Sequence, residues 1–319
     1  MDVVLCLSRG LTKHNADIFK IAAHPKTSQM AITGYNGVWL WDMQREEQAT
    51  PFIKRDIIYS TFSPSGDHLA ITENRRLCLW DVQGKKELWG KTLQEKKQYQ
   101  FLEVWDAAFS PDGKVLASVD QAALRLWDVA TGKVFWKRQW VTDTIYSVAF
   151  SPDGRHLAAG DGIGSVRIWQ QAAGWSPATL AGRPPRALKM SYPSFGIWCV
   201  AFSPDGRFLA SSNSLSDGTT DPAGCVIRLW DVASGGLIRQ FAGFVKDVCS
   251  LAFSPDGHFL AAAGDQTVRL WDVNDGKELW SLPEPDEQLQ PRSVAWNFDS
   301  RFLAVARGKE IQLWQVLHS

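Results

Sequence analysis

The sequence predicts an all-β fold, a seven-bladed β-propeller of four-stranded antiparallel blades, on three observations. A tryptophan closes each of seven related segments, at Trp41, Trp80, Trp127, Trp169, Trp230, Trp271 and Trp314. These tryptophans are spaced 39, 47, 42, 61, 41 and 43 residues apart, and five of them are followed by aspartate. A Ser-Pro-Asp-Gly turn, or a close variant, recurs at one place in five segments. A period of about 40–45 residues with a Trp-Asp ending is typical of propeller blades.

Each segment contains the same expected strands in the same order, as the fourth segment shows. A first strand at 146–150 ends in the turn 151–154, where Pro presets φ, Asp bonds nearby backbone and Gly accepts a positive φ. Alternating apolar and polar or small residues then predict a second strand at 156–159 and a third at 166–169. In the third segment a Gly-containing turn leads to a fourth, outer strand around Phe135 and Trp136. Four short strands make one blade.

The last segment lacks a fourth strand of its own. It supplies strands around Val294, Leu303 and Leu313, but the chain ends five residues after Trp314. The apolar run at the N-terminus has no other evident place, so we expect residues 1–8 to form the outer strand of blade seven. This would close the ring, protect its edges and make residues 1–319 a single domain.

Composition excludes several classes of function. Lys+Arg and Asp+Glu each number 34, and zero net charge argues against nucleic acid as the main partner. No apolar stretch approaches the roughly 20 residues that a membrane helix needs, and the N-terminus has no basic leader. The five cysteines are odd in number and never two residues apart, which favours reduced thiols over disulfides or a metal site. We therefore expect a soluble, cytoplasmic protein.

The repeated Trp-Asp and Ser-Pro-Asp-Gly units resemble the WD-repeat family over almost the whole chain, and their uniformity is similar to that of prokaryotic members. The resemblance implies a propeller that holds proteins together; prokaryotic ones often accompany ATPases, kinases or proteases. This chain departs from the family pattern in three ways. No Gly-His pair precedes any blade, and Gly243 is followed by Phe244. Blades four and seven end in Gln170 and Gln315 where the family has Asp. We expect Asp120, Asp161 and Asp265 to serve tight turns or bond backbone amides instead.

Differences between the repeats gather on one expected face of the ring. The loops at 94–100, 182–194, 211–224 and 283–288 carry almost all the length variation, and the second contains Arg183 and Arg186. Insertions on one face commonly mark a binding face, although tolerated loop drift would leave the same pattern.

The mouth of the central channel on that face is formed by residues at the start of each inner strand. One position reads Phe19, Ile58, Trp105, Tyr146, Trp198, Cys249 and Arg292. Two residues earlier the blades carry Asp17, Asp56, Glu103, Thr144, Gly196, Asp247 and Gln290. The family uses these positions to contact partners, so the resemblance implies an aromatic and acidic mouth that would suit a basic peptide segment. Packing between blades is the alternative reading of these aromatic residues.

The sequence indicates no catalytic site, no metal site and no cofactor. His68, His156 and His258 occupy equivalent positions in alternate blades, too far apart on the ring to share a metal. The turn serines repeat as structural residues do, and the glycine-rich run at 160–164 lacks the lysine of a phosphate loop. Arg125, Arg167, Arg228 and Arg269 recur two residues before the blade tryptophan, which indicates a packed face more often than a site for phosphorylated ligands.

Three functions remain open. The leading hypothesis is a non-catalytic scaffold or recognition subunit that binds a protein at the channel mouth. The second is a sensor whose aromatic mouth encloses a methylated lysine or a similar cation. The third is a hydrolase or lyase with an unrecognised channel site.

Overall fold

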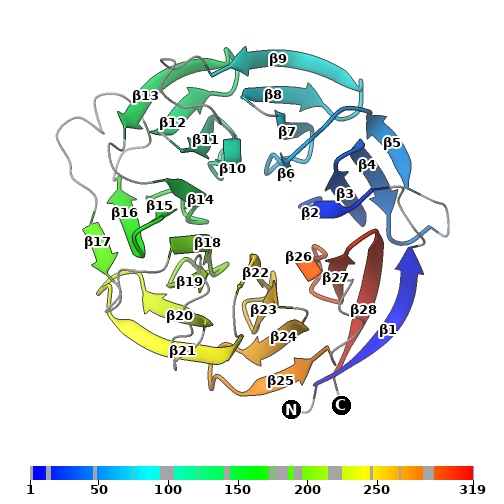
Figure 1. Ribbon diagram of the computed structural model, residues 1–319, viewed down its shortest axis with the longest axis vertical. Helices are drawn as coiled ribbons and strands as arrows, with labels where there is room; N and C mark the ends of the chain where they lie inside the picture. Colours follow the sequence, from blue (N-terminus) through cyan, green and yellow to red (C-terminus); the bar gives the residue numbers. More distant parts are fainter. Residues whose placement is uncertain are drawn as a thin grey trace.

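The computed structural model describes residues 3–11, 16–45, 49–73, 75–93, 104–121, 123–139, 144–171, 175, 186–189, 196–214, 225–244, 247–265, 267–282 and 291–318. These residues form strands and turns, and no helix occurs among them. The strands make seven four-stranded antiparallel sheets arranged as blades around a central axis (Figure 1). The predicted seven-bladed β-propeller is therefore confirmed.

The strands of each blade follow one another from the central channel outward. Blade one comprises β2 (Ile18–Ala23), β3 (Gln29–Gly34), β4 (Gly37–Asp42) and β5 (Thr50–Ile53). Blade two comprises β6 (Tyr59–Phe62), β7 (His68–Glu73), β8 (Arg76–Asp81) and β9 (Lys86–Thr92). Blade three comprises β10 (Val104–Phe109), β11 (Val115–Asp120), β12 (Ala123–Asp128) and β13 (Lys133–Gln139). Blades four and five comprise β14 (Ile145–Phe150), β15 (His156–Asp161), β16 (Ser165–Gln170) and β17 (Arg186–Lys189); and β18 (Gly196–Phe202), β19 (Phe208–Ser214), β20 (Cys225–Asp231) and β21 (Leu237–Phe244). Blade six comprises β22 (Ser250–Phe253), β23 (Phe259–Gly264), β24 (Thr267–Asp272) and β25 (Glu278–Ser281).

Blade seven is completed by the N-terminal strand, as expected. Its inner strands are β26 (Pro291–Trp296), β27 (Phe302–Arg307) and β28 (Glu310–His318), and β1 (Val3–Leu11) is the outer one. β1 pairs antiparallel with β28 from Val3 opposite His318 to Leu11 opposite Ile311. The closing strand thus reaches three residues beyond the expected limit at residue 8, and the two chain ends lie side by side (Figure 1).

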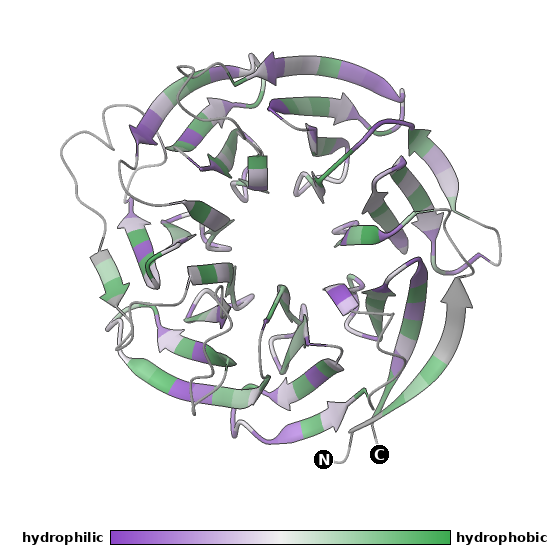
Figure 2. Cartoon of the chain, viewed as in Figure 1, coloured by the Kyte–Doolittle hydropathy of each residue, from purple (hydrophilic) through white to green (hydrophobic). Residues whose placement is uncertain are grey.

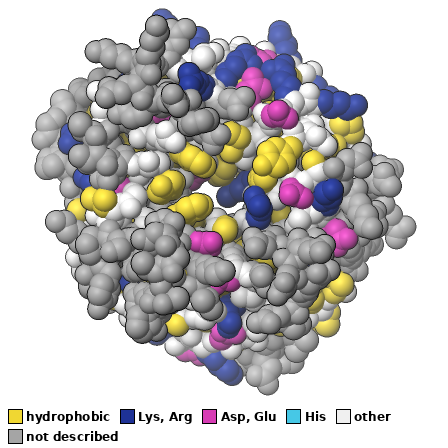
Figure 3. All heavy atoms as spheres, in the orientation of Figure 1, with side chains coloured by type: hydrophobic (Ala, Val, Ile, Leu, Met, Phe, Trp, Pro, Cys, Tyr) yellow, Lys and Arg dark blue, Asp and Glu magenta, His cyan; other side chains and the backbone are white. Residues whose placement is uncertain are grey.

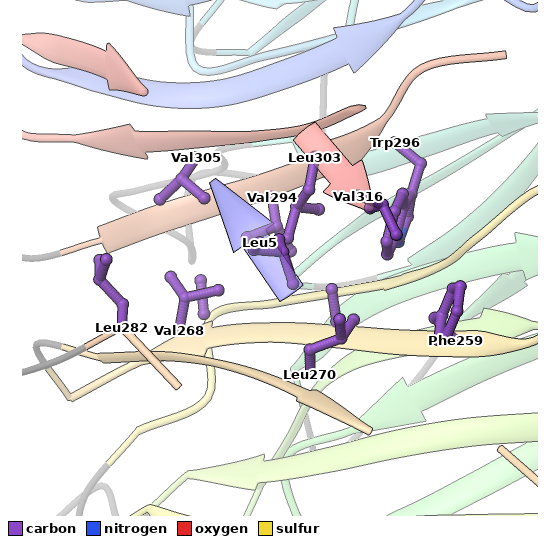
Figure 4. Packing of buried hydrophobic residues seen from close by; sticks show 12 residues of the cluster. Leu5, Phe259, Val268, Leu270, Leu282, Val294, Trp296, Leu303, Val305 and Val316 are labelled. Atoms are coloured by element: carbon purple, nitrogen blue, oxygen red, sulfur yellow. The ribbon is translucent and has the colours of Figure 1, made fainter. Parts of the chain in front are cut away.

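The hydrophobic core is divided among the seams between neighbouring blades. Seven clusters of buried residues each draw on two adjacent blades, one cluster to a seam. Hydrophobic residues occur in strands of every blade (Figure 2), and β11 and β23 are buried along their whole length, so a blade can pack against both neighbours. At the seam of blades six and seven, Leu5 of β1 packs with Leu270, Val294 and Leu303 (Figure 4). The closing strand is therefore part of the core as well as of the sheet.

Turn residues and tryptophans make recurring hydrogen bonds within blades three, four and five. In blade four the backbone N–H of His156 donates to Ser151 Oγ at 2.8 Å, and Gly154 has a φ of 69°. The indole N–H of Trp127 donates to Ser118 Oγ at 2.9 Å, and Trp230 does the same to Ser211.

The loop aspartates bond backbone amides, as expected. Asp120 accepts from the N–H of Ala123 at 2.8 Å, and Asp161 accepts from the N–H of Ser165 at 2.7 Å. Each of the two also forms an ion pair with the arginine two residues before the blade tryptophan, Arg125 or Arg167. In these two blades the loop aspartate therefore pairs with an arginine of the third strand.

Candidate functional site

The mouth of the central channel is built on a ring of buried anchors at the start of the inner strands. Ile18, Ile57, Val104, Ile145, Ile197 and Val248 are at most 1% exposed, and Pro291 is buried at the same place in blade seven. The backbone then bulges in five blades, because the residue after the anchor is left out of the pairing with the second strand. The bulge lets that residue turn toward the mouth while its neighbours stay in the sheet.

Three of the expected aromatic residues form a continuous row across blades three to five. The rings of Trp105 and Tyr146 meet edge to face with their centroids 6.1 Å apart. Tyr146 and Trp198 stack at 5.3 Å with an angle of 17° between their planes. Trp105 and Tyr146 are partly buried, whereas Trp198 is 39% exposed. The row therefore presents one rigid apolar surface at the mouth.

Blades six, seven and one make the other side of the mouth charged. The guanidinium of Arg292 lies over the ring of Phe19 at 5.6 Å, and Tyr35 meets the same ring edge to face at 4.3 Å. The backbone N–H of Asp247 donates to the side chain of Asp265 at 2.8 Å. In the space-filling view, hydrophobic side chains gather around the central opening and basic ones lie beside it (Figure 3). The mouth thus has an apolar half and a charged half.

The remaining expected site residues are not drawn into these contacts. Asp56 is exposed and Asp17 is partly exposed. Glu103 and Arg183 lie outside the described residues, and Arg186 is described only as the first residue of β17. The loops 94–100 and 283–288 also lie outside them, as do most of 182–194 and of 211–224.

A second ring of side chains, which the sequence reasoning missed, lies two residues after each anchor. In four blades the side-chain oxygen at this position accepts a hydrogen bond from a backbone N–H on the inner strand of the next blade. Val148 donates to Asp106 Oδ2 at 3.0 Å and Val200 donates to Ser147 Oγ at 3.2 Å. The same contact recurs from Val294 to Ser250 Oγ at 3.3 Å and from Ile21 to Ser293 Oγ at 3.1 Å. These bonds tie neighbouring blades together along the channel.

Blades one and two carry Lys20 and Tyr59 at this position, and there the pattern changes. The ammonium of Lys20 lies 4.9 Å from the centre of the Tyr59 ring, and the Tyr59 hydroxyl bonds to Asp106. Burial raises the pKa of Asp106, while Lys20 and the hydrogen bonds from Val148, Tyr59 and Ser147 act in the opposite direction. Burial and the neighbouring Asp106 raise the pKa of Tyr59 well above its usual value. The channel wall therefore contains a buried, coupled polar cluster.

Within the described residues, no group of three or more His, Cys, Asp or Glu side chains is placed to hold a metal ion. No helix within the described ranges is long and apolar enough to cross a membrane. None of the five cysteines, all of which lie within the described residues, forms a disulfide.

The seven four-stranded antiparallel blades around a central channel define a seven-bladed β-propeller. Residues 92–128, 137–170, 188–231 and 235–272 match the family model described as "WD domain, G-beta repeat", and these stretches correspond to blades three to six. The four repeats, together with the seven-bladed fold, support membership of the WD-repeat propeller family.

Several well-characterised proteins are similar to part of the chain. Pre-mRNA-processing factor 19 of Oryza sativa subsp. japonica is 31% identical over 103 residues, which cover 32% of this chain and 18% of that protein. Protein groucho of Drosophila melanogaster is 33% identical over 106 residues, 33% of this chain and 13% of groucho. Small ribosomal subunit protein RACK1y of Oryza sativa subsp. japonica is 34% identical over 106 residues, 31% of this chain and 28% of RACK1y. The chain matches less than a third of each relative's length.

Proposed function

We propose that the protein is a non-catalytic scaffold or recognition subunit that binds a protein partner at the channel mouth. The observation that carries this proposal is the aromatic row of Trp105, Tyr146 and Trp198. Aromatic side chains are enriched at binding hot spots because they bury much area at little entropic cost. Here the row is already packed, so little conformational freedom would be lost on binding. The names of similar proteins, such as a pre-mRNA-processing factor and a ribosomal subunit protein, agree with work within larger assemblies.

The charged half of the mouth adds a preference for a basic segment in the partner. Asp247, Asp17 and Asp56 precede the inner strands of blades six, one and two, and carboxylates pair with Arg or Lys. Arg292 lies over Phe19 and so already occupies one aromatic face. We therefore assign the basic residues of the partner to the carboxylates and its apolar residues to the aromatic row. A reducing interior such as the cytoplasm suits five cysteines that form no disulfide.

The sensor hypothesis finds less support in the geometry. A cage for a methylated ammonium needs ring faces around an open space. Tyr146 and Trp198 instead stack face to face at 17°, so each covers a face of the other. This favours a flat platform for an apolar segment.

Replacing Trp198 with alanine is expected to abolish partner capture without unfolding the protein. Trp198 lies outside the buried core at 39% exposure, so the loss of stability should be small. A hot-spot tryptophan contributes about 2–4 kcal/mol to binding, which corresponds to a roughly 30-fold or greater weakening. The measurement is affinity purification from native cells with quantitative mass spectrometry.

Phe298→Ala is the matched control, because Phe298 is also 39% exposed but lies in the turn between β26 and β27, at the opposite end of the channel. It should capture the same proteins as the wild type. Undiminished capture by Trp198→Ala would remove the channel mouth from the proposal.

A further inference from the structure

Blade four carries glycine at a position where every other blade carries a side chain. The position is the second-strand residue that pairs with the inner-strand residue two places after the anchor. In chain order it reads Thr33, Thr72, Val119, Gly160, Ser212, Ala263 and Ala306. A Cβ on Gly160 would lie 2.4 Å from Cγ2 of Ile197 and 2.9 Å from its carbonyl oxygen. The buried anchor of blade five therefore lies directly against the backbone of blade four.

This close approach coincides with the stacked pair of aromatic rings at the mouth. Trp198 directly follows Ile197 in β18, which lies beside β14 (Figure 1), so the position of the anchor sets where the indole lies. At this seam Tyr146 and Trp198 are 5.3 Å apart with 17° between their planes. At the seam of blades three and four, where Val119 packs beside the next anchor, the rings of Trp105 and Tyr146 are 6.1 Å apart and meet at 70°. Parallel stacking thus occurs where the second strand has glycine.

Two further glycines hold the edge of the Tyr146 ring. A Cβ on Gly196 would lie 3.2 Å from Cε2 of Tyr146 and 3.4 Å from Cα of Gly162. A Cβ on Gly162 would lie 3.5 Å from the same ring carbon. The backbone N–H of Gly162 donates to the carbonyl of Thr144 at 2.8 Å, which fixes the turn beside the ring. The tyrosine edge therefore fits against two stretches of bare backbone.

The same glycines distinguish blades four and five from the rest of the mouth. Where these blades have Thr144 and Gly196, the others have Asp17, Asp56, Glu103, Asp247 and Gln290. Blades four and five thus lack the carboxylate, and in blade five the backbone approaches the tyrosine instead. In the glycine-rich run 160–164, Gly164 adopts a φ of 79° for the turn, while the other two glycines lie against the aromatic pair or its anchor.

We propose that Gly160, Gly162 and Gly196 are positioning residues, which hold Tyr146 and Trp198 in the stacked arrangement that the partner binds. This inference rests on the proposed function. Side chains that are fixed by their surroundings lose little conformational freedom on binding, so the spacing of the two blades contributes to affinity. Because these blades carry no carboxylate at the mouth, the stacked pair presents a flat apolar surface to an uncharged segment of the partner.

The test measures ring geometry and partner capture on the same full-length variants. In protein labelled with ¹³C-tyrosine, the ring protons of Tyr146, assigned with Tyr146→Phe, should be shifted upfield by the indole, and Trp198→Ala should remove this shift. Gly196→Ala should move these signals toward those of Trp198→Ala. Gly160→Ala should move them further, because it displaces the anchor. Both glycine variants should weaken capture of the proteins that Trp198→Ala loses by roughly tenfold.

Gly236→Ala is the matched control. Gly236 lies in the turn between β20 and β21, at the end of blade five away from the mouth. Among the described residues, a Cβ there would meet only the hydroxyl of Ser234, at 3.3 Å. This variant should leave both the Tyr146 signals and partner capture unchanged.

Two results would overturn the inference. Tyr146 signals that stay in place in both glycine variants would show that these glycines do not position the rings. Altered signals with undiminished capture would show that the partner does not depend on the stacking. Gly196→Ala decides the matter if Gly160→Ala does not fold, because its Cβ requires a shift of only a few tenths of an ångström. Trp198→Ala tests the channel mouth by itself, so failure of the glycine variants leaves that proposal standing.

Discussion

Substituting Leu5 with aspartate is expected to lower the melting temperature of the whole protein by on the order of 10 °C. Leu5 is 6% exposed and packs in the seam of blades six and seven against Leu270, Val294 and Leu303. Aspartate would bring an unpaired charge into this apolar cluster, which costs about 3–5 kcal/mol. In this seam the N-terminal strand packs against the C-terminal blades, so the substitution should weaken the closure of the ring.

Leu7→Asp is the control for this substitution. Leu7 lies two residues further along β1 but is 54% exposed, and its replacement should change the melting temperature by no more than a degree or two. Deleting residues 1–11 should have a larger effect than Leu5→Asp, because it also exposes the backbone edge of β28 to pairing with other chains. Differential scanning calorimetry measures the first effect, and size-exclusion chromatography measures any association. A melting curve that is unchanged by the deletion would contradict the role of β1.

The period of the repeats made the architecture predictable, because each feature of it depends on local sequence. Turns such as 151–154 need particular residues at particular positions, and the anchors such as Ile145 repeat in register with them. The incomplete seventh segment predicted that β1 would close the ring. The end of β1 at Leu11 was not predictable, because the strand continues to pair with β28 beyond a bulge between Leu7 and Arg9.

The contacts between blades were harder to predict, because they depend on how the backbone bulges after each anchor. The sequence places a small polar residue at Ser147, Ser250 and Ser293, two residues after the anchor, and this recurrence was the available signal. Unless the bulge is known, the sequence does not show whether these serines bond to the next blade or to their own blade. The mouth aromatics raised the same difficulty: their position was predictable, but the stacking of Tyr146 on Trp198 depends on the spacing of two blades.

Asp106→Ala is expected to destabilise the protein by about 2–4 kcal/mol, since buried donors that lose their acceptor each cost about 1–3 kcal/mol. Asp106 accepts from the backbone of Ala107 at 2.8 Å and of Val148 at 3.0 Å, and from Ser147 Oγ at 2.8 Å. It also bonds to Tyr59, so one side chain links blades two, three and four. Asp56→Ala, which removes an exposed carboxylate at the mouth, should be nearly neutral. Chemical denaturation of both variants compares these losses.

Asp106 should also make stability depend on pH in a definite direction. Burial raises its pKa in the folded protein above the unfolded value, so the folded state favours the protonated carboxyl. The contribution of this group is fully present below the unfolded pKa of about 3.9 and is lost as the pH rises through the raised folded pKa. Asp106→Asn cannot ionise. The stability of the wild type relative to this variant should therefore decrease as the pH rises from about 4 toward neutrality.

The physical cause of this dependence is a competition at one side chain between desolvation and its donors. Lys20 and the hydrogen bonds from Val148, Tyr59 and Ser147 favour the ionised form, and burial opposes them more strongly. Replacing Lys20 with methionine removes the cation but keeps the apolar stem, so the pKa of Asp106 in the folded protein should rise further and the pH-dependent decrease should continue to higher pH. If the difference in stability between the wild type and Asp106→Asn stays constant over this pH range, Lys20 and the hydrogen-bond donors outweigh burial. The carboxylate then remains charged within the channel wall. Either result shows whether Asp106 is charged in the folded protein. Asp106 stands at the position that carries serine in blades four, six and seven, and it links blades two, three and four.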